Sequence, residues 1–319
     1  MLADRAGLPR GSRVTMRVRR PADETLAVTL RTWEHEAQVL AAVRPWLANV
    51  PQPLVRDRDY GVLTYAAGTT LADVSPAGKP LDRIHLEQLG GVFGALLRVP
   101  VAQLPARPAH WPADGDSAGF LRMLLAFAEQ VRLDHDAEFG LLFRRMGVPQ
   151  DALTRLAGTA APLTPRPFAL LHTDLHRRNI VVRDDRTLHV IDWELSSFGD
   201  PAYELATHLC RTDYPEWQWD EAVEVWRAAA TAVSPAFAAA LDADLPAYVR
   251  YERAQSVYPD VMRAARALVS PRAPLRMTEA VRRARLALHR AAPALGMTAV
   301  PDRADVTAAL NDWLRALPA

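Results

Sequence analysis

The chain has 319 residues, of which 50% are hydrophobic and 24% charged, a balance that excludes a disordered or collagen-like protein. A net charge of +1 gives no global field for binding nucleic acid or an acidic membrane, and the single cysteine, Cys210, excludes an intrachain disulfide. No apolar segment is long enough to span a bilayer and the N-terminus has no apolar signal core, so we expect a cytoplasmic protein.

The first part of the chain is predicted to be rich in strands. Alternating apolar and basic residues indicate a half-buried strand over residues 13–20. A helix is expected over 24–47, where apolar residues recur at helical spacing. Two short strands are expected over 54–56 and 61–65, joined by a charged turn. The Gly-Thr-Thr sequence that begins at Gly68 then breaks the pattern and ends this part.

The rest of the chain is predicted to be mostly helical. Helices are expected over residues 81–98, 119–132, 138–147, 221–232, 247–269, 278–291 and 304–317. One region interrupts them, where the apolar runs 180–182 and 188–191 flank a turn-forming cluster of arginines and aspartates. This pattern is typical of a β-hairpin.

The most informative segment precedes the hairpin and reads His172-Thr173-Asp174-Leu175-His176-Arg177-Arg178-Asn179, and Ile191-Asp192-Trp193-Glu194 follows the hairpin. Because a hairpin returns its ends to within a few ångströms, we expect Asp174, Asn179 and Asp192 to converge. Two acids and an amide suit Mg²⁺, because this ion binds oxygen ligands and substrate phosphates can complete its coordination shell. One of the carboxylates would then remain free to orient a hydroxyl group. The alternative is that these three residues are turn-capping polar groups.

These residues carry a resemblance to a known family. HTDLHRRN followed by IDWE resembles the catalytic loop and metal-binding signature of the aminoglycoside phosphotransferases and choline kinases, small-molecule relatives of the protein kinases. The later Gly199-Asp200-Pro201 sequence agrees with the family pattern in order. The resemblance implies an α+β, bilobal, protein-kinase-like fold. Its nucleotide-binding lobe would span 1–68, and its catalytic and acceptor-binding lobe would span 69–319.

The resemblance also implies roles for the motif residues. Asp174 would be the catalytic base or hydroxyl-orienting carboxylate, and Asn179 and Asp192 would hold Mg²⁺. His176 stands where protein kinases keep a lysine near the γ-phosphate, so a phosphate contact is its implied catalytic role. The role of Asp200 is left open: it is either the N-cap of a helix or a catalytic residue.

Five further residues of the motif region are expected to have structural or surface roles. We expect His172 to be a packed histidine that braces the loop. Thr173 stands where the family often has glycine, and Glu204 replaces the more usual aspartate. Arg177 and Arg178 replace Pro-Gly or a similar pair, and we expect them to face solvent rather than phosphate.

By the same resemblance, a strand cation paired with a helix glutamate should hold the α- and β-phosphates. Of the 38 basic residues only Lys79 is a lysine, and it lies beyond the break in the pattern. We therefore expect Arg19 to be the cation, with Arg17 as the reserve and Glu36, in an E-A-x-V-L sequence, as the glutamate. The alternative for both arginines is a solvated strand face.

The purine is expected to pair with backbone groups near Tyr65 and Ala67, which leaves ATP and GTP equally open as donors. Only about a dozen residues precede the first strand, too few for the hairpin that the resemblance implies there, so we expect either a shortened nucleotide-binding lobe or a chain that starts inside the natural protein. The acceptor should lie against the helical part, where acidic and aromatic candidates for a cationic acceptor are Asp213, Glu216, Trp217, Trp219, Asp220, Tyr251, Glu252, Tyr258 and Asp260.

The expected reaction is Mg²⁺-dependent transfer of a γ-phosphoryl group from ATP or GTP to a small-molecule hydroxyl. Antibiotic modification is the first expectation, and a metabolic kinase of an amino alcohol or sugar is the alternative. A binding protein that has lost phosphoryl transfer is the rival from another class, which the intact Asp174, Asn179 and Asp192 oppose. No nucleic acid or membrane partner is expected, and the oligomeric state is open.

Overall fold

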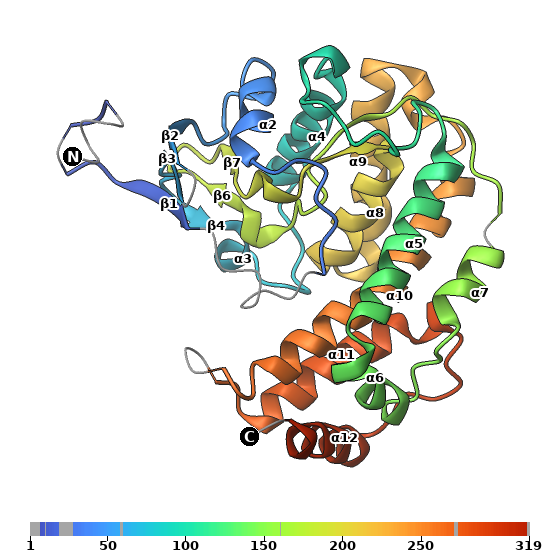
Figure 1. The fold of residues 1–319 in the computed structure, drawn as a ribbon. Coiled ribbons are helices and arrows are strands. Elements are labelled where there is room, and N and C mark those ends of the chain that lie inside the picture. Colours follow the sequence, from blue (N-terminus) through green and yellow to red (C-terminus); the bar gives the residue numbers. More distant parts are fainter. Residues whose placement is uncertain are drawn as a thin grey trace. The chain divides into compact units, whose positions relative to one another are not determined.

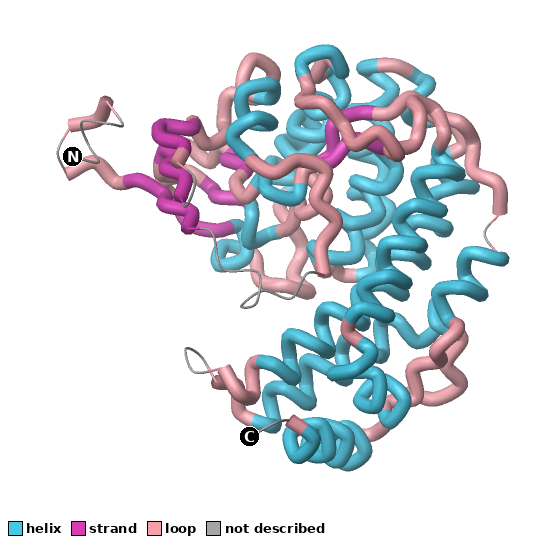
Figure 2. The backbone as a smooth tube through the Cα atoms, in the orientation of Figure 1, coloured by secondary structure: helices cyan, strands magenta, loops and turns pink. Residues whose placement is uncertain are grey.

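The structure of the chain is a computed structural model that describes residues 7–9, 11–18, 28–57, 60–159, 161–270 and 274–317 (Figures 1 and 2). Its contacts divide the chain into two compact units. Unit 1 comprises 1–21, 29–120 and 164–245, and unit 2 comprises 22–28, 121–163 and 246–319. The lobe boundary expected at residue 68 lies within unit 1 and stays a prediction.

The described strands lie in unit 1, where they form three small antiparallel sheets ordered β1-β3-β2, β4-β6-β7 and β5-β8. Their bounds are β1 Val14–Val18, β2 Pro53–Arg56, β3 Tyr60–Thr64, β4 Thr69–Thr70, β5 Ala169–Leu171, β6 Ile180–Val182, β7 Leu188–Val190 and β8 Ser197–Gly199. The predicted first strand, strand pair and hairpin are confirmed. β5 and β8 lie on either side of the hairpin in the chain, and they pair with each other.

Unit 1 also contains helices that pack under the sheets. They are α2 Glu36–Val43, α3 Leu71–Val74, α4 Arg83–Arg98, α8 Pro201–Thr212 and α9 Trp219–Val233, with short 3-10 helices at Arg177–Asn179 and Trp193–Leu195. α4 packs along α9, where Gly90 meets Val225. α8 is buried except at Cys210 and Arg211, and it packs against β5 and α9.

Unit 2 is helical, with α6 Asp136–Arg145, α7 Ala152–Gly158, α11 Met277–Leu295 and α12 Arg303–Ala316. α5 Ser117–Asp134 and α10 Leu241–Arg266 begin in unit 1 and continue in unit 2. Phe139 of α6 stacks on Trp313 of α12 with ring centroids 5.6 Å apart. None of the helices described in the structure combines the length and apolar composition that a bilayer-spanning segment requires.

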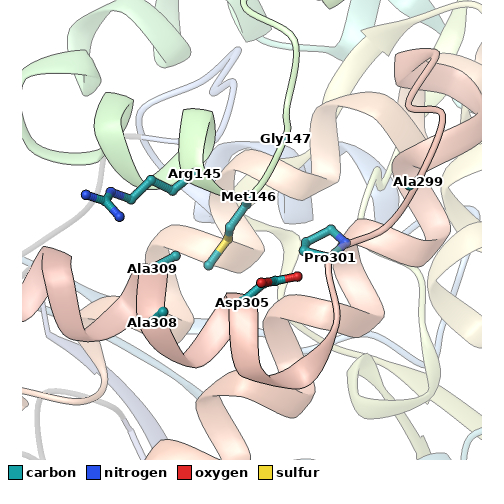
Figure 3. Close-up of a pocket in the computed structure, with 8 residues that line it drawn as sticks. All are labelled: Arg145, Met146, Gly147, Ala299, Pro301, Asp305, Ala308 and Ala309. Carbon is teal, nitrogen blue, oxygen red and sulfur yellow. The ribbon is translucent and has the colours of Figure 1, made fainter.

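A pocket of about 340 Å³ lies in unit 2 (Figure 3). Residues at the end of α6 and on α12 line it, together with the segment before α12: Arg145, Met146, Gly147, Ala299, Pro301, Asp305, Ala308 and Ala309. Asp305 takes part in the capping box that begins α12, and Arg145 pairs with Asp312. None of the sequence-predicted site residues lines this pocket.

The helix predicted over 24–47 is wrong in its first part among the described residues. α2 begins only at Glu36, and residues 28–35 are not helical. In this segment Thr32 donates a buried hydrogen bond to Ser197 (2.8 Å), and the Trp33 indole donates to the carbonyl of Pro105 (3.1 Å). These tertiary hydrogen bonds hold the segment in an irregular path despite the helical spacing of its apolar residues.

Candidate active site

His172 follows β5 and braces the motif loop, as expected. It is fully buried, and burial lowers its pKa to about 4, so the ring is neutral near pH 7. Nδ1 accepts the backbone N–H of Asp174 (3.3 Å), which leaves Nε2–H to donate to the carbonyl of Ile191 (3.0 Å). One ring thereby connects the loop before the hairpin to the segment after it.

The hairpin brings the polar residues of the motif together. The backbone N–H of Ile191 donates to the carbonyl of Asn179 (2.9 Å), one step beyond the last β6–β7 pair. The amide nitrogen of Asn179 donates to Asp174 at Oδ2 (2.7 Å) and at the backbone carbonyl (2.9 Å). Asn179 therefore fixes the Asp174 carboxylate and keeps its own amide oxygen as the atom available to a metal.

Two non-glycine residues of the site have left-handed backbone conformations, Thr173 at φ 60° and Asp192 at φ 67°. Such conformations cost about 1–3 kcal/mol each and persist where the surroundings impose them. Thr173, at the glycine position of the family, donates its backbone N–H to Glu204 Oε2 (2.8 Å) and its hydroxyl to the carbonyl of Leu195 (2.7 Å). These two hydrogen bonds hold the strained turn.

Glu204 lies on α8 beneath this turn. Its side chain is buried, and burial raises its pKa to about 7, although the backbone N–H groups of Thr173 and His172 oppose the shift. Its Oε1 is buried without a hydrogen-bond partner among the described residues. The acid that replaces the family's aspartate is thus a structural support of the loop, and its charged form is disfavoured.

Asp200 caps α8 and accepts the N–H of Ala202 (2.9 Å). Both of its carboxylate oxygens also accept hydrogen bonds from Nη1 of Arg166, at 2.9 and 2.8 Å, and both side chains are fully buried. Nη2 of Arg166 donates to Asp244 (2.9 Å). Asp200 therefore has the capping role that the sequence left open.

Arg17 of β1 lies between Glu36 and Asp192. Its Nη2 is 2.7 Å from Asp192 Oδ1, and its Nε is 3.5 Å from Glu36 Oε1. Burial raises the pKa of Glu36, while Arg17 and a hydrogen bond from the backbone of Trp193 oppose this. Arg17 Nε, Glu36 Oε2 and Asp192 Oδ1 are buried without a well-aligned hydrogen bond among the described residues. Arg19, the first choice for the strand cation, lies outside the described residues.

The other basic residues of the motif, His176, Arg177 and Arg178, have different environments. His176 Nε2 lies 3.5 Å from Asp174 Oδ1, and burial lowers the pKa of its ring. Arg178 is exposed, as expected. The expectation that Arg177 faces solvent is wrong, because this side chain is buried and hydrogen-bonds to the carbonyl oxygens of Ser75, Pro76, Lys79 and Thr212 and to the hydroxyl of Ser75.

Two residues of α8 that the sequence reasoning missed contact the loop. Arg211 Nη1 donates to Asp174 Oδ1 (2.6 Å), and His208 Nδ1–H donates to the carbonyl of Leu175 (2.6 Å). Burial lowers the pKa of His208 to about 4, so its neutral Nε2 accepts the hydroxyl of Tyr214 (2.8 Å). With Glu204 they are spaced i, i+4 and i+7, which places all three on one helix face and is the signal that could have found them.

The segment expected to bind the purine follows β3. Tyr65 and Ala67 are exposed there, and Gly68 has φ 138°. A Cβ at Gly68 would come within 2.2 Å of the carbonyl oxygen of Val182, so only glycine allows β4 to approach β6 this closely. The acceptor candidates Tyr251, Glu252 and Tyr258 are buried, whereas Trp217 is 68% exposed.

Comparisons with known proteins agree with this geometry. Residues 7–241 match the phosphotransferase enzyme family. A comparison with curated protein sequences finds no match.

Solved structures with a similar fold include enzymes with different acceptors. The Plasmodium vivax ethanolamine kinase is 11% identical, with 88% of this chain and 75% of that chain covered and a TM-score of 0.59. The macrolide 2′-phosphotransferase MphH of Brachybacterium faecium is 17% identical, with 92% and 86% covered and a TM-score of 0.52. A ternary complex of aminoglycoside phosphotransferase APH(4)-Ia with AMP-PNP and hygromycin B is 16% identical, with 92% and 88% covered and a TM-score of 0.51. The predicted protein-kinase-like α+β fold is confirmed.

Proposed function

Because the chain belongs to the phosphotransferase enzyme family, we propose that this phosphotransferase moves the γ-phosphoryl group of ATP or GTP to a hydroxyl group of a small molecule. The observation that carries the proposal is the hydrogen bond of Asn179 to Asp174 at one end of a hairpin whose other end presents Asp192. This is an acid, an amide and a second acid at one place, in the chain order in which kinases carry their catalytic and metal-binding residues.

The residues present fit Mg²⁺. Asn179 Oδ1 and the Asp192 carboxylate would hold the ion, since both are the oxygen ligands that this hard cation prefers. Asp192 Oδ1 lies 2.7 Å from Nη2 of Arg17, so the ion would share this oxygen with the guanidinium or bind the other carboxylate oxygen. No group of three or more His, Cys, Asp or Glu side chains among the described residues is arranged to hold a metal, so phosphates and water would complete the shell. When bound, the ion would neutralise charge on the phosphates.

In this proposal Asp174 orients the acceptor hydroxyl and takes up its proton as the phosphoryl group transfers. Its Oδ2 is held by Asn179, and its side chain is 18% exposed, so the carboxylate is both fixed and accessible. Little covalent chemistry is asked of the protein, and positioning of hydroxyl and phosphate in line supplies most of the rate. His176, beside Asp174, would contact the transferred phosphate as a neutral hydrogen-bond donor.

The nucleotide would lie between β1 and the segment after β3. Arg17 replaces the lysine of related kinases and, next to Glu36, would bind the α- and β-phosphates. Its Nε lies 3.5 Å from Glu36 Oε1, so the glutamate would hold the guanidinium beside the phosphates. Backbone groups near Tyr65 and Ala67 would pair with the base. The AMP-PNP bound to the similar APH(4)-Ia structure supports a nucleotide donor.

The test is turnover with a panel of hydroxylated antibiotics and metabolites, measured as Mg²⁺-dependent release of ADP or GDP. Asp174→Asn should abolish release while circular dichroism and the Tm stay unchanged, and Asp184→Asn, in the exposed hairpin turn, is the matched control. Turnover by the Asp174→Asn variant at the wild-type rate would refute the role of Asp174. An antibiotic in the panel as the best acceptor would support the resistance function expected from the sequence.

A further inference from the structure

Arg17 contacts two acids of the candidate site, and it lies closer to the acid that would hold the metal. Its Nη2 is 2.7 Å from Asp192 Oδ1, whereas its Nε is 3.5 Å from Glu36 Oε1. We propose that Arg17 occupies the Asp192 carboxylate while the site is empty, and that it moves to Glu36 and the phosphates when nucleotide and metal bind together. The inference rests on the proposed function, because it concerns how that site takes up its nucleotide and its metal.

The first argument is the competition between two cations for one carboxylate. A guanidinium 2.7 Å from Oδ1 already supplies the positive charge that Asp192 would otherwise take from a metal. A divalent ion on either oxygen of this carboxylate would lie beside the guanidinium. Like charges at such short range repel strongly where part of the water is excluded, and the Asp192 side chain is only 27% exposed. Each of the two cations therefore weakens the binding of the other.

The second argument is that Arg17, rather than Asp192, is the partner that can move. Asp192 has a left-handed backbone conformation (φ 67°) and is the N-cap of the 3-10 helix Trp193–Leu195. The Trp193 side chain is fully buried, and its indole N–H donates to the carbonyl of Val190 (3.0 Å), which fixes the backbone next to Asp192. Arg17 is a long side chain on β1, the outer strand of its described sheet, and it is 37% exposed.

The third argument is that Glu36 offers the guanidinium a second position. Glu36 begins α2, and its side chain is 13% exposed, about half the exposure of Asp192. Burial raises the pKa of Glu36, and Arg17 opposes this shift. The more buried carboxylate gains more from a close ion pair, because less water stabilises its charge. Its Oε1 is already 3.5 Å from Arg17 Nε, so a small change in the terminal torsions of the arginine would complete this pair.

The exchange would couple metal binding to nucleotide binding. In the absence of nucleotide, a metal ion has to displace Arg17 and gains only side-chain and water oxygens. In the presence of nucleotide, the phosphates attract the released guanidinium and also give oxygen ligands to the metal. A free divalent ion should therefore bind the empty site poorly, and Arg17 should account for part of the increase in metal affinity that the nucleotide causes.

Mn²⁺, an oxygen-binding ion with an electron paramagnetic resonance signal, is the probe for the metal site in the protein without nucleotide. We expect Arg17→Met to bind Mn²⁺ at least about tenfold more tightly than wild type, and Arg17→Lys, which keeps the charge, to stay close to wild type. Arg31→Met is the matched control, because it removes an arginine that pairs with Glu194 (3.1 Å) rather than with Asp192. Adding Asp192→Asn to Arg17→Met should remove the gained Mn²⁺ binding.

A second measurement does not depend on the folding of Arg17→Met. With EDTA present, Asp192→Asn should bind metal-free ADP at least about tenfold more tightly than wild type, because it releases the guanidinium to the phosphates. Glu194→Gln also removes one negative charge near the site, and it should change this affinity by less than about twofold. Both affinities are measured by calorimetry.

Equal Mn²⁺ affinities of wild type and Arg17→Met, an equal gain in Arg31→Met, or a gain that survives Asp192→Asn would overturn the inference. Unchanged binding of metal-free ADP by Asp192→Asn would overturn it as well. Failure of the proposed function has a different signature, which is the absence of turnover and of Mg²⁺-dependent binding of ATP or GTP in wild type. The Mn²⁺ comparison uses protein without nucleotide, so it decides whether Arg17 and the metal compete in either case.

Discussion

Glu204→Gln should make the free energy of unfolding less dependent on pH, because Glu204 is a buried acid whose neutral form is favoured in the folded protein. Its pKa rises from 4.5 to about 7 on folding, mainly through burial. Between these two values the folded protein keeps a proton that the unfolded chain has lost. The stabilising contribution of Glu204 is therefore complete below pH 4.5 and declines as the pH rises through 7.

The size of the effect follows from 1.36 kcal/mol per pKa unit, which gives a loss of about 2–3 kcal/mol between pH 5 and pH 8. Glutamine is neutral throughout and can still accept the N–H of Thr173, so the variant should lack this loss. The free energy of unfolding is measured in urea at pH 5, 6, 7 and 8 for wild type, Glu204→Gln and the exposed control Glu224→Gln. Wild type and Glu204→Gln curves that run parallel across this range, or a control that changes as much, would refute the burial argument.

Three further predictions concern the ion pairs of the site and its support. Asp192→Ala should remove the Mg²⁺ dependence of nucleotide binding, which calorimetry with and without Mg²⁺ measures, and an unchanged dependence would contradict the metal role. Arg17→Met should weaken ATP binding by about tenfold, the loss of a charge-assisted contact, and should also lower the Tm, because Glu36 and Asp192 both lose their guanidinium partner. Full affinity for ATP would exclude the phosphate role. Asp200→Asn should lower the free energy of unfolding by about 3–5 kcal/mol, because Arg166 would keep a fully buried charge without its main partner, and a loss below 1 kcal/mol in urea melts would contradict this.

The parts of the site that could be predicted from the sequence are those formed by residues close to one another along the chain. The loop, the turn-forming cluster and the two apolar runs lie within about 25 residues, so hairpin geometry alone brings Asp174 and Asn179 near Asp192. The cap at Asp200 is equally local, since Asp followed by Pro is a helix-start signal. The pairing of β6 with β7 confirms the hairpin that this short-range pattern predicts.

The parts that could not be predicted depend on contacts between distant segments. The spacing of Glu204, His208 and Arg211 places them on one face of a helix, but it does not say which distant segment that face meets, so the contact of Arg211 with Asp174 could not be predicted. Residues 28–35 have helical spacing but are held by hydrogen bonds to Pro105 and Ser197, which no local pattern encodes. Arg17, the reserve candidate for the strand cation, pairs with Glu36, whereas Arg19, the first choice, lies outside the described residues.

The hydrogen bonds of Arg177 have a consequence for how the catalytic loop assembles. This one guanidinium binds carbonyl oxygens in residues 75–79 and at Thr212, so it ties together segments that are about a hundred and about 35 residues away along the chain. Native packing of both segments therefore stabilises the conformation of the loop. Local opening of either segment would release the loop as well. On mild heating, turnover should then be lost at a lower temperature than the main unfolding transition, because local unfolding of the less stable of the two segments is enough to disrupt the loop.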